Sequence, residues 1–136
     1  MVIDTSAIIA ILLEEPEAPY LMQAIALDKV RLISTFSVLE ASFVIASRKG
    51  DAGLQQLKQF LEFIKVEQKS LTDTQVNLAT EAWLKFGKGR HSASLNIGDC
   101  CTYALSKETN EPLLFKGNDF SQTDLNLVDY SGFLFE

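Results

Sequence analysis

Histidine and cysteine are scarce in this sequence, which has one histidine and two cysteines among its 136 residues. The cysteines, Cys100 and Cys101, are adjacent, and that spacing suits neither an ordinary structural disulfide nor a metal site. We therefore expect both to be small core residues. A disulfide scaffold and a zinc centre built on histidine and cysteine are excluded by the same shortage.

Long hydrophobic runs are also absent, and none approaches the length needed to cross a membrane. The apolar stretch at residues 7–13 has no basic leader and no small-residue cleavage pattern, which argues against a secretory signal. We expect a cytoplasmic protein that does not bind membranes. Only 3 prolines and 7 glycines accompany 47% hydrophobic residues, so a disordered chain is excluded too.

The chain is acidic, with 12 basic and 18 acidic residues and a formal net charge of −6. This balance argues against a protein that coats nucleic acid through general charge attraction. It does not exclude a nuclease, because cations bound by acidic side chains change the local field. The length suits one folded unit with its own core, and no linker or repeat is visible, so we expect a single domain over residues 1–136.

Hydrophobic periodicity and capping residues predict alternating strands and helices. Strands are expected over residues 2–4, 30–33, 66–71 and 112–115, with a final edge strand over 125–128. Helices are expected over residues 7–13, 16–27, 36–47, 51–64, 72–86 and 97–109. Strands separated by helices indicate an α/β fold with a mainly parallel central sheet between two helical layers.

Two acidic residues stand in unusual places in the first third of the chain. Asp4 lies at the carboxyl end of the first strand, where open α/β sheets bind ligands. A helix cap is the alternative for Asp4. Glu40 is the one charged residue in the apolar helical stretch between Phe36 and Ala46, so it faces either the interior or a cleft. Its alternative is an ion pair with Lys116 or Arg48.

Two further acids follow later in the chain. Asp99 lies in the first turn of the helix over 97–109, where capping is the alternative, and Asp119 follows the strand over 112–115, where turn chemistry is the alternative. Together with Asp4 and Glu40, these positions can converge at the carboxyl edge of a parallel sheet. Such close like charges need divalent cations, and oxygen ligands favour Mg²⁺ or Mn²⁺. A site of this kind can hydrolyse phosphodiesters.

Several ordered motifs give the chain a family resemblance that covers nearly its whole length. They are Met1-Val2-Ile3-Asp4-Thr5-Ser6-Ala7, Leu39-Glu40-Ala41, Phe86-Gly87-Lys88-Gly89-Arg90-His91, Leu95-Asn96-Ile97-Gly98-Asp99-Cys100 and Leu113-Leu114-Phe115-Lys116-Gly117-Asn118-Asp119-Phe120. The set resembles the PIN-domain ribonucleases of the VapC toxin type. The resemblance implies a PIN-like three-layer α/β/α fold.

The same resemblance implies a Mg²⁺-dependent endoribonuclease, with Mn²⁺ as a possible substitute, that forms the toxin of a toxin–antitoxin pair. Its metal-binding and catalytic acids would be Asp4, Glu40, Asp99 and Asp119, assisted by Thr5 or Ser6. Asn118 stands where many relatives have aspartate, so the choice between Asn118 and Asp119 as a ligand is open. The implied partners are RNA, a VapB-like antitoxin and a second copy of the chain in a homodimer.

Basic residues precede Asp99 in a glycine-flanked loop. Lys85, Lys88, Arg90 and His91 are candidates for binding RNA phosphates, and Arg90 is favoured because its planar guanidinium suits phosphate. A solvated turn is the alternative. As a general base, His91 ranks below a water activated by metal. Three nearby aromatic residues are expected to lie in the core: Trp83, Phe86 and Tyr103.

Three other functions compete with this interpretation. Aspartyl-phosphate phosphatases need a second aspartate two residues after the first, where this chain has Ser6. A Mg²⁺-binding phosphoacceptor receiver domain has no use for Glu40 inside its third helix. A non-catalytic PIN-like domain that binds only RNA or protein is disfavoured because all four acids are present.

Overall fold

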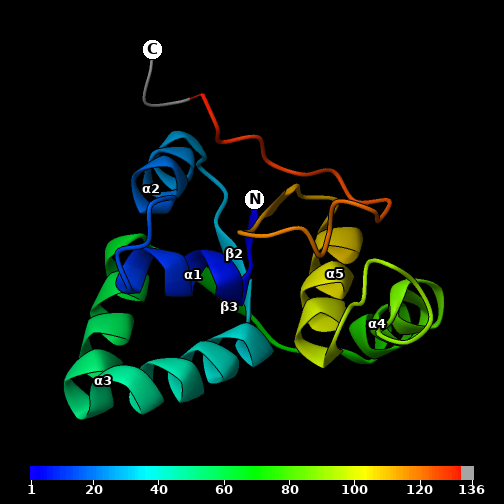
Figure 1. Ribbon diagram of the computed structural model, residues 1–136, viewed down its shortest axis with the longest axis horizontal. Helices are drawn as coiled ribbons and strands as arrows, with labels where there is room; N and C mark the ends of the chain where they lie inside the picture. Colours follow the sequence, from blue (N-terminus) through cyan, green and yellow to red (C-terminus); the bar gives the residue numbers. More distant parts are fainter. Residues whose placement is uncertain (133–136) are drawn as a thin grey trace.

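The computed structural model of the protein describes residues 1–132 and contains a parallel sheet with helices on both faces (Figure 1). The strands are β1 (Val2–Ile3), β2 (Leu32–Ser34), β3 (Glu67–Lys69) and β4 (Leu113–Leu114). The helices are α1 (Thr5–Leu12), α2 (Ala18–Leu27), α3 (Thr35–Phe63), α4 (Asp73–Phe86) and α5 (Ile97–Thr109). The strand order is β3-β2-β1-β4, and every pairing is parallel, which confirms the expected α/β sheet.

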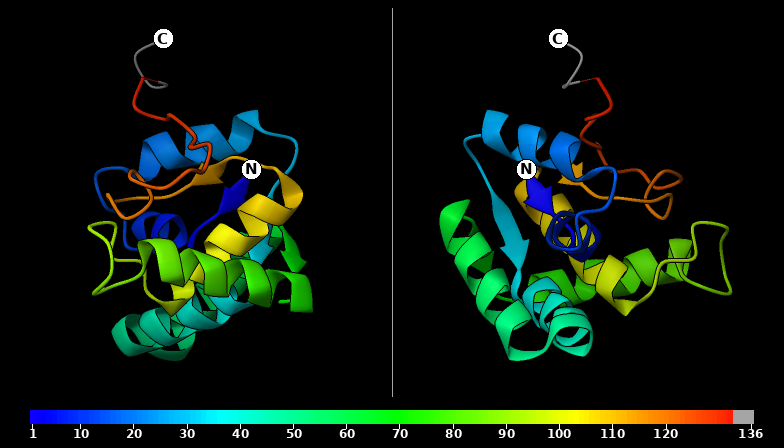
Figure 2. Two further views of the ribbon diagram at one scale, coloured as in Figure 1. Left: turned by 90° about the vertical axis from the view of Figure 1, so that its right-hand side faces the viewer. Right: turned by 60° about the vertical axis from the view of Figure 1, so that its left-hand side comes forward.

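The sheet separates two hydrophobic cores, because successive strand residues point to opposite faces. One core joins the sheet to α1, α2 and α3, and its strand residues are Ile3, Ile33 and Leu114. The other joins the sheet to α4 and α5, and its strand residues are Val2, Leu32 and Leu113. Figures 1 and 2 show the resulting three layers, with α4 and α5 on the side opposite α1 and α2.

Helix α3 is bent where the sequence predicts a break. Its N-cap is Ser34, whose Oγ accepts a hydrogen bond from the Phe36 amide at 3.2 Å. Gly50 has non-helical backbone angles, φ 62° and ψ −152°, in a region that glycine adopts without strain. The two helices expected on either side of residues 48–50 therefore form, but they join directly at Gly50 instead of leaving a loop.

The edge strand expected over residues 125–128 is reduced to one parallel bridge between Leu113 and Leu127. The Leu113 amide donates to the Asn126 carbonyl and the Val128 amide donates to the Leu113 carbonyl, each at 2.9 Å. That prediction was too long, because β4 itself has only two residues and offers no further ladder. Similarly, the strand expected over 66–71 covers only residues 67–69.

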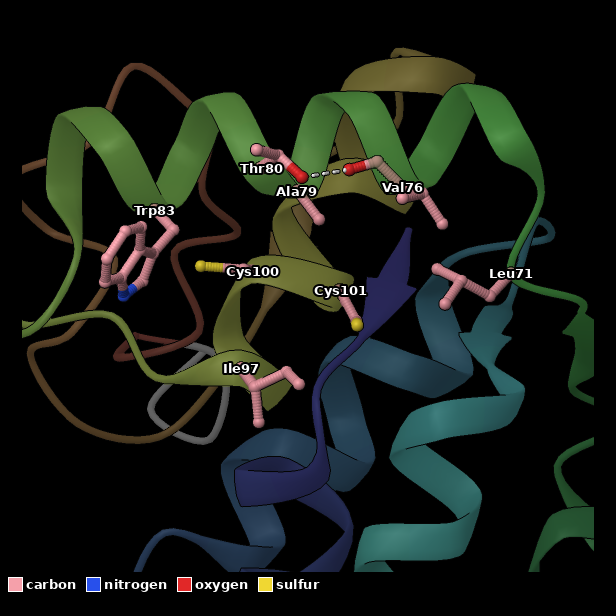
Figure 3. Close-up of a pocket in the computed structure, with 8 residues that line it drawn as sticks. All are labelled: Leu71, Val76, Ala79, Thr80, Trp83, Ile97, Cys100 and Cys101. Atoms are coloured by element: carbon pink, nitrogen blue, oxygen red, sulfur yellow. Dashed lines mark hydrogen bonds between the residues drawn. The ribbon is translucent and has the colours of Figure 1, made fainter.

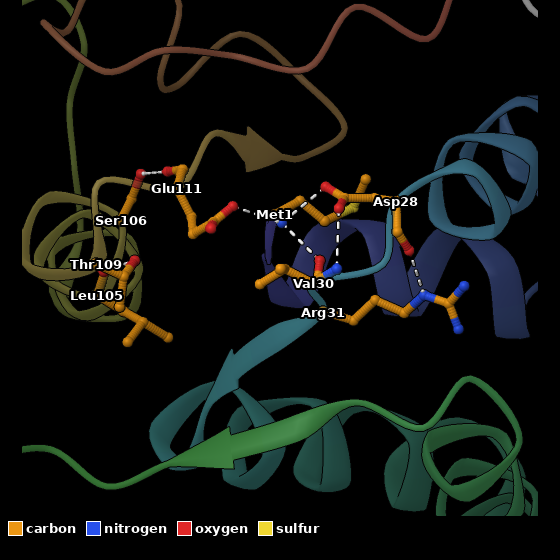
Figure 4. A network of polar contacts seen from close by, with 8 residues as sticks. All are labelled: Met1, Asp28, Val30, Arg31, Leu105, Ser106, Thr109 and Glu111. Atoms are coloured by element: carbon orange, nitrogen blue, oxygen red, sulfur yellow. Dashed lines mark hydrogen bonds and ion pairs between the residues drawn. The ribbon is translucent and has the colours of Figure 1, made fainter.

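The amino group of Met1 anchors β1 at the centre of the sheet (Figure 4). It donates to Asp28 Oδ2 at 2.8 Å, to the Val30 carbonyl at 2.6 Å and to Glu111 Oε2 at 3.0 Å. Partial burial raises the pKa of Asp28, but the hydrogen bonds from the amino group and the Val30 amide, together with the positive charges of the amino group and Arg31, lower it by more, so the net pKa is lowered. These contacts join the segments before β2 and β4 to the start of β1.

Two expectations based on composition can be compared with the structure. Cys100 and Cys101 are buried and free, which confirms their prediction as core residues. Across residues 1–132, no helix combines the length and the hydrophobicity that crossing a membrane requires.

Candidate functional site

Asp4 lies between β1 and α1 and is almost completely buried. Its Oδ2 accepts hydrogen bonds from the Ser6 amide at 3.0 Å and the Ser6 hydroxyl at 2.7 Å. Its Oδ1 accepts one from the Thr102 hydroxyl at 2.7 Å. Asp4 therefore caps α1, as the alternative interpretation required, while its other oxygen is directed to α5.

Asp99 is also both a cap and a member of the acidic cluster, which comprises Asp4, Glu40, Asp99 and Asp119. The Asp99 amide donates to Asn96 Oδ1 at 2.9 Å, and the Asn96 amide donates to Asp99 Oδ2 at 3.0 Å. This reciprocal capping box fixes the first turn of α5. The Asp99 side chain is thus held at a helix N-terminus, where negative charge is favoured.

Glu40 reaches the first turn of α5 from α3. A Cβ added at Gly98 would lie 2.5 Å from Glu40 Oε2, so the carboxylate rests directly on the glycine next to Asp99. The alternative ion pair with Lys116 does not form, because Lys116 pairs with Glu15 and, at 3.3 Å, with Glu17. Glu40 therefore lies against the first turn of α5, next to Asp99.

Asp119 lies in the exposed loop that follows β4, next to Asn118. Its charge contributes to raising the pKa of Asp4 and of Asp99, although burial is the larger cause for both. The Asn118 carbonyl accepts a hydrogen bond from the Ser121 amide at 3.2 Å and so shapes the turn. This loop therefore brings the charged Asp119 to the cluster.

The pKa of Asp99 responds to the charges of the three other acids in the cluster. Burial is the largest influence on Asp99, and with the negative charges of Asp4, Asp119 and Glu40 it raises the pKa of Asp99 to about 7. Burial likewise raises the pKa of Asp4, although hydrogen bonds from Ser6 and Thr102 oppose it. The negative charges of acids from three other segments therefore all act on Asp99.

The hydroxyl groups around Asp4 have different partners. Ser6 Oγ donates to Asp4 and accepts from the Lys116 amide at 3.0 Å, which ties the loop after β4 to the site. The Thr5 hydroxyl instead donates to the Ser37 carbonyl at 3.3 Å. Of the two expected assisting residues, Ser6 is the one whose side chain contacts Asp4.

Sequence reasoning missed Thr102, Asn96 and Gly98, which hold the acids in place. Two of them had a readable signal. Asn96 and Asp99 have the spacing of a capping box, and Thr102 lies three residues after Asp99 and so on the same face of α5. Gly98 had no such signal in the sequence, because its role depends on contact with Glu40, which lies on the distant helix α3.

The basic loop before Asp99 exposes Lys88 and Arg90. The Arg90 guanidinium lies over the Trp83 ring, 4.3 Å from its centroid. His91 Nδ1 accepts a hydrogen bond from the Ala93 amide at 3.0 Å, and its ring packs edge-on against Phe86. His91 is therefore held as part of the loop, whereas Arg90 is presented on an aromatic surface.

Trp83 corrects one prediction about the core. Tyr103 is buried and Phe86 half-buried, as expected, but Trp83 is 41% exposed. It borders an apolar groove of about 400 Å³ between α4 and α5, shown in Figure 3. The groove is lined by Leu71, Val76, Ala79, Thr80, Trp83, Ile97, Cys100 and Cys101. Trp83 is exposed because α4 turns it toward this surface and Arg90 instead of the sheet.

The acids offer hard oxygen donors but are not arranged as a closed cage. Within residues 1–132, no three histidine, cysteine, aspartate or glutamate side chains already form a group that could hold a metal ion. Both oxygens of Asp4 and one oxygen of Asp99 accept hydrogen bonds from the chain. The donor chemistry and mutual repulsion nevertheless fit Mg²⁺ or Mn²⁺, which carboxylate oxygens prefer.

Comparison with known proteins reveals extensive similarity. The PIN domain family matches residues 1–126. The chain is 48% identical to Ribonuclease VapC of Mycolicibacterium smegmatis over 94% of its own length and 99% of the relative's. It is 44% identical to Ribonuclease VapC30 of Mycobacterium tuberculosis, over 94% of its own length and 98% of the relative's.

Solved structures share the fold at low sequence identity. VapC20 of Mycobacterium tuberculosis, a toxin that cleaves the sarcin-ricin loop, has a TM-score of 0.76 and 17% identity, with 93% of this chain and 97% of that chain covered. VapBC2 of Rickettsia felis, bound to a DNA fragment from its promoter, has a TM-score of 0.75 and 13% identity, with 94% and 96% covered. The family match and the sequence relatives agree with this fold: the chain belongs to the PIN-domain family of VapC ribonucleases.

Proposed function

We propose that this chain is a Mg²⁺-dependent endoribonuclease and the toxin of a VapBC-type toxin–antitoxin pair. The observation that carries the proposal is the placement of three acids around the first turns of α1 and α5: Asp4 accepts a hydrogen bond from Thr102 on α5, Asp99 closes the capping box of α5, and the Glu40 carboxylate lies against Gly98. Relatives named ribonucleases that match over nearly the whole chain support the RNA substrate.

Asp4, Asp99, Asp119 and Glu40 would hold the cation. When bound, Mg²⁺ supplies Lewis acidity toward the phosphodiester and its attacking water. Ser6 orients Asp4 from one side, and the capping box orients Asp99 from the other. Arg90, with Lys88 beside it, provides positive charge for the RNA backbone.

RNA cleavage by the purified, partner-free chain tests this proposal. Cleavage is expected with Mg²⁺ or Mn²⁺ and should stop in excess EDTA. Asp4→Asn and Asp99→Asn should each abolish most activity, because each removes charge needed by the cation. Asp73→Asn, which changes an exposed acid in the first turn of α4, serves as the matched control. Cleavage that persists in EDTA, or at the parent rate in both site variants, would refute the metal mechanism.

We further propose two partners, a VapB-like antitoxin and a second copy of the chain. The solved toxin–antitoxin complex from Klebsiella pneumoniae, which has a TM-score of 0.72, supports the first by analogy of fold. A groove of about 360 Å³ between α1 and the second half of α3, with Leu12, Phe60 and Phe63 in its lining, suits an amphipathic antitoxin helix. The apolar α4–α5 groove suits self-association.

A further inference from the structure

Thr102 makes a contact that the family comparison does not assign. It is fully buried on α5, and its hydroxyl donates to Asp4 Oδ1 at 2.7 Å. Its oxygen also lies 3.3 Å from the Ser37 hydroxyl, which comes from α3 and is buried as well. A threonine hydroxyl has a single proton to donate, and in Thr102 that proton is directed to Asp4. In the contact between the two hydroxyls, Ser37 is therefore the donor and Thr102 the acceptor.

We propose that Thr102, supported by Ser37, is a positioning residue that fixes the orientation of the Asp4 carboxylate for binding a divalent cation. The inference rests on the proposed function, since it assigns Asp4 to the cation. It adds a hydroxyl pair that touches no substrate and acts through Asp4 alone.

The geometry gives Thr102 a role that Ser6 cannot fill. Ser6 donates twice to Oδ2 and thereby fixes one end of the carboxylate. Rotation about that end would still swing Oδ1, and the Thr102 hydroxyl is the donor that holds it. Because Asp4 is only 4% exposed, water cannot readily replace this donor.

The same hydroxyl pair joins the helices that carry two other acids. Ser37 lies one turn before Glu40 on α3, and Thr102 lies one turn after Asp99 on α5. Residues three apart lie on the same helical face. The Ser37–Thr102 contact therefore sets the spacing of α3 and α5 at the level of the acidic cluster.

Calorimetric titration of the metal-free chain with Mn²⁺, without RNA, tests the proposal. Thr102→Val keeps the shape but removes the hydroxyl, and the Kd for Mn²⁺ should rise roughly tenfold or more, as for other residues that support metal ligands. Thr102→Ser restores a donor and should remain close to the parent. Ser37→Ala removes only the supporting hydroxyl and should give an intermediate rise in Kd.

Thr109→Val is the matched control, because its hydroxyl, also on α5, donates to the Leu105 carbonyl and not to the cluster. This variant should bind Mn²⁺ like the parent. If Thr102→Val and Ser37→Ala both keep the parent Kd while Asp4→Asn weakens binding, the positioning role is wrong and the proposed function stands. If the parent binds no Mn²⁺ and cleaves no RNA, both fall.

Discussion

Asp99 combines two demands that oppose each other. Its carboxylate completes the capping box of α5, yet it is buried beside three other acids. A carboxyl group in an unfolded chain has a pKa of about 4, whereas in the folded protein the pKa of Asp99 is about 7, mainly through burial. The folded state therefore binds a proton that the unfolded state has already released across that interval.

The expected consequence is that the metal-free chain loses stability as the pH rises from about 4 to about 7. Asp99→Asn removes the charge that causes this loss and keeps an oxygen for the capping box. We expect the variant to be more stable than the parent by about 1–2 kcal/mol near pH 8, and the gain to vanish near pH 4. Chemical denaturation at both pH values, in EDTA, measures it.

Asp73→Asn provides the comparison for this experiment, since it neutralises an exposed first-turn acid on α4. It should show no such pH-dependent gain. A parent and an Asp99→Asn variant with parallel stability curves would mean that Asp99 carries no electrostatic penalty in the folded chain.

Single residues also show how far the sequence can predict a site. The four acids could be found because a charge in an apolar helix or just after a strand is unusual at its own position. Thr102 and Gly98 are ordinary residues for a helix, and only their contacts with Asp4 and Glu40 give them a role. Those contacts depend on how distant elements pack, which local patterns do not encode.

At the scale of elements, the end of α4 and the basic loop act together. Trp83 comes from the last turns of α4, and its ring supports the Arg90 guanidinium at 4.3 Å. A guanidinium stacked on an aromatic ring has fewer conformations to lose when it binds phosphate. Trp83 should therefore contribute to RNA binding without contacting RNA itself.

Arg90→Ala should weaken RNA binding and lower its salt dependence by about 0.7 in the logarithmic slope, the value for one phosphate contact on a single strand. Trp83→Ala should also weaken binding but keep more of the slope, because the Arg90 charge remains. Binding at several salt concentrations, measured on an Asp4→Asn background so that RNA stays intact, tests this. Trp83→Phe should retain part of the RNA affinity that Trp83→Ala loses, because an aromatic ring still supports Arg90.

Leu84→Ala changes the exposed neighbour of Trp83 on α4 and should leave both affinity and slope unaltered. Equal slopes for the parent and the Arg90→Ala variant would instead assign Arg90 to a solvated turn.

Elements were easier to predict by kind than by extent. Capping residues located the starts of α3 and α4, since Ser34 and Thr72 accept hydrogen bonds from their first turns, whereas the cap of α5, Asn96, was missed. The strand at 125–128 was overestimated because β4 offers only two residues for pairing, while the apolar side chains of Leu125 and Val128 pack against the two cores. The pattern of apolar side chains alone does not show whether a segment only packs against a core or also pairs along a sheet.

At the scale of the whole molecule, two grooves lie on different sides of the sheet, one with a mixed polar and apolar lining and one with a mainly apolar lining. One is the groove between α1 and α3, where Phe63 is 74% exposed. The other is the groove between α4 and α5, where Val76 is 46% exposed. Different helices build the two grooves, so different partners can occupy them at the same time.

A glutamate placed in one groove at a time should distinguish antitoxin binding from self-association. Phe63→Glu should lose binding to the antitoxin, which we expect to be the product of a reading frame adjacent to the one for this chain. The variant should still sediment as a dimer, because the charge enters only the α1–α3 groove. Val76→Glu should sediment as a monomer but still bind that product. Co-purification and analytical ultracentrifugation of both variants measure the two outcomes.

Leu27→Glu places the same charge on an exposed position of α2 that lines neither groove, and it should change neither property. If Val76→Glu and the parent sediment alike, self-association does not use the α4–α5 groove. Co-expression should also give a complex without RNase activity, and an active complex would contradict the antitoxin assignment.

The connection between β1 and β4 has a consequence for protein synthesis. Val2 pairs with Leu113, and the Ser6 hydroxyl meets the Lys116 amide across 110 positions of the chain. A ribosome makes Asp4 long before Asp119, so a nascent chain lacks the assembled acids until the loop after β4 has emerged. We therefore expect translation products that stop before Asp119 not to cleave RNA, so the proposed activity would appear only after the loop that follows β4 has been made and has joined the sheet.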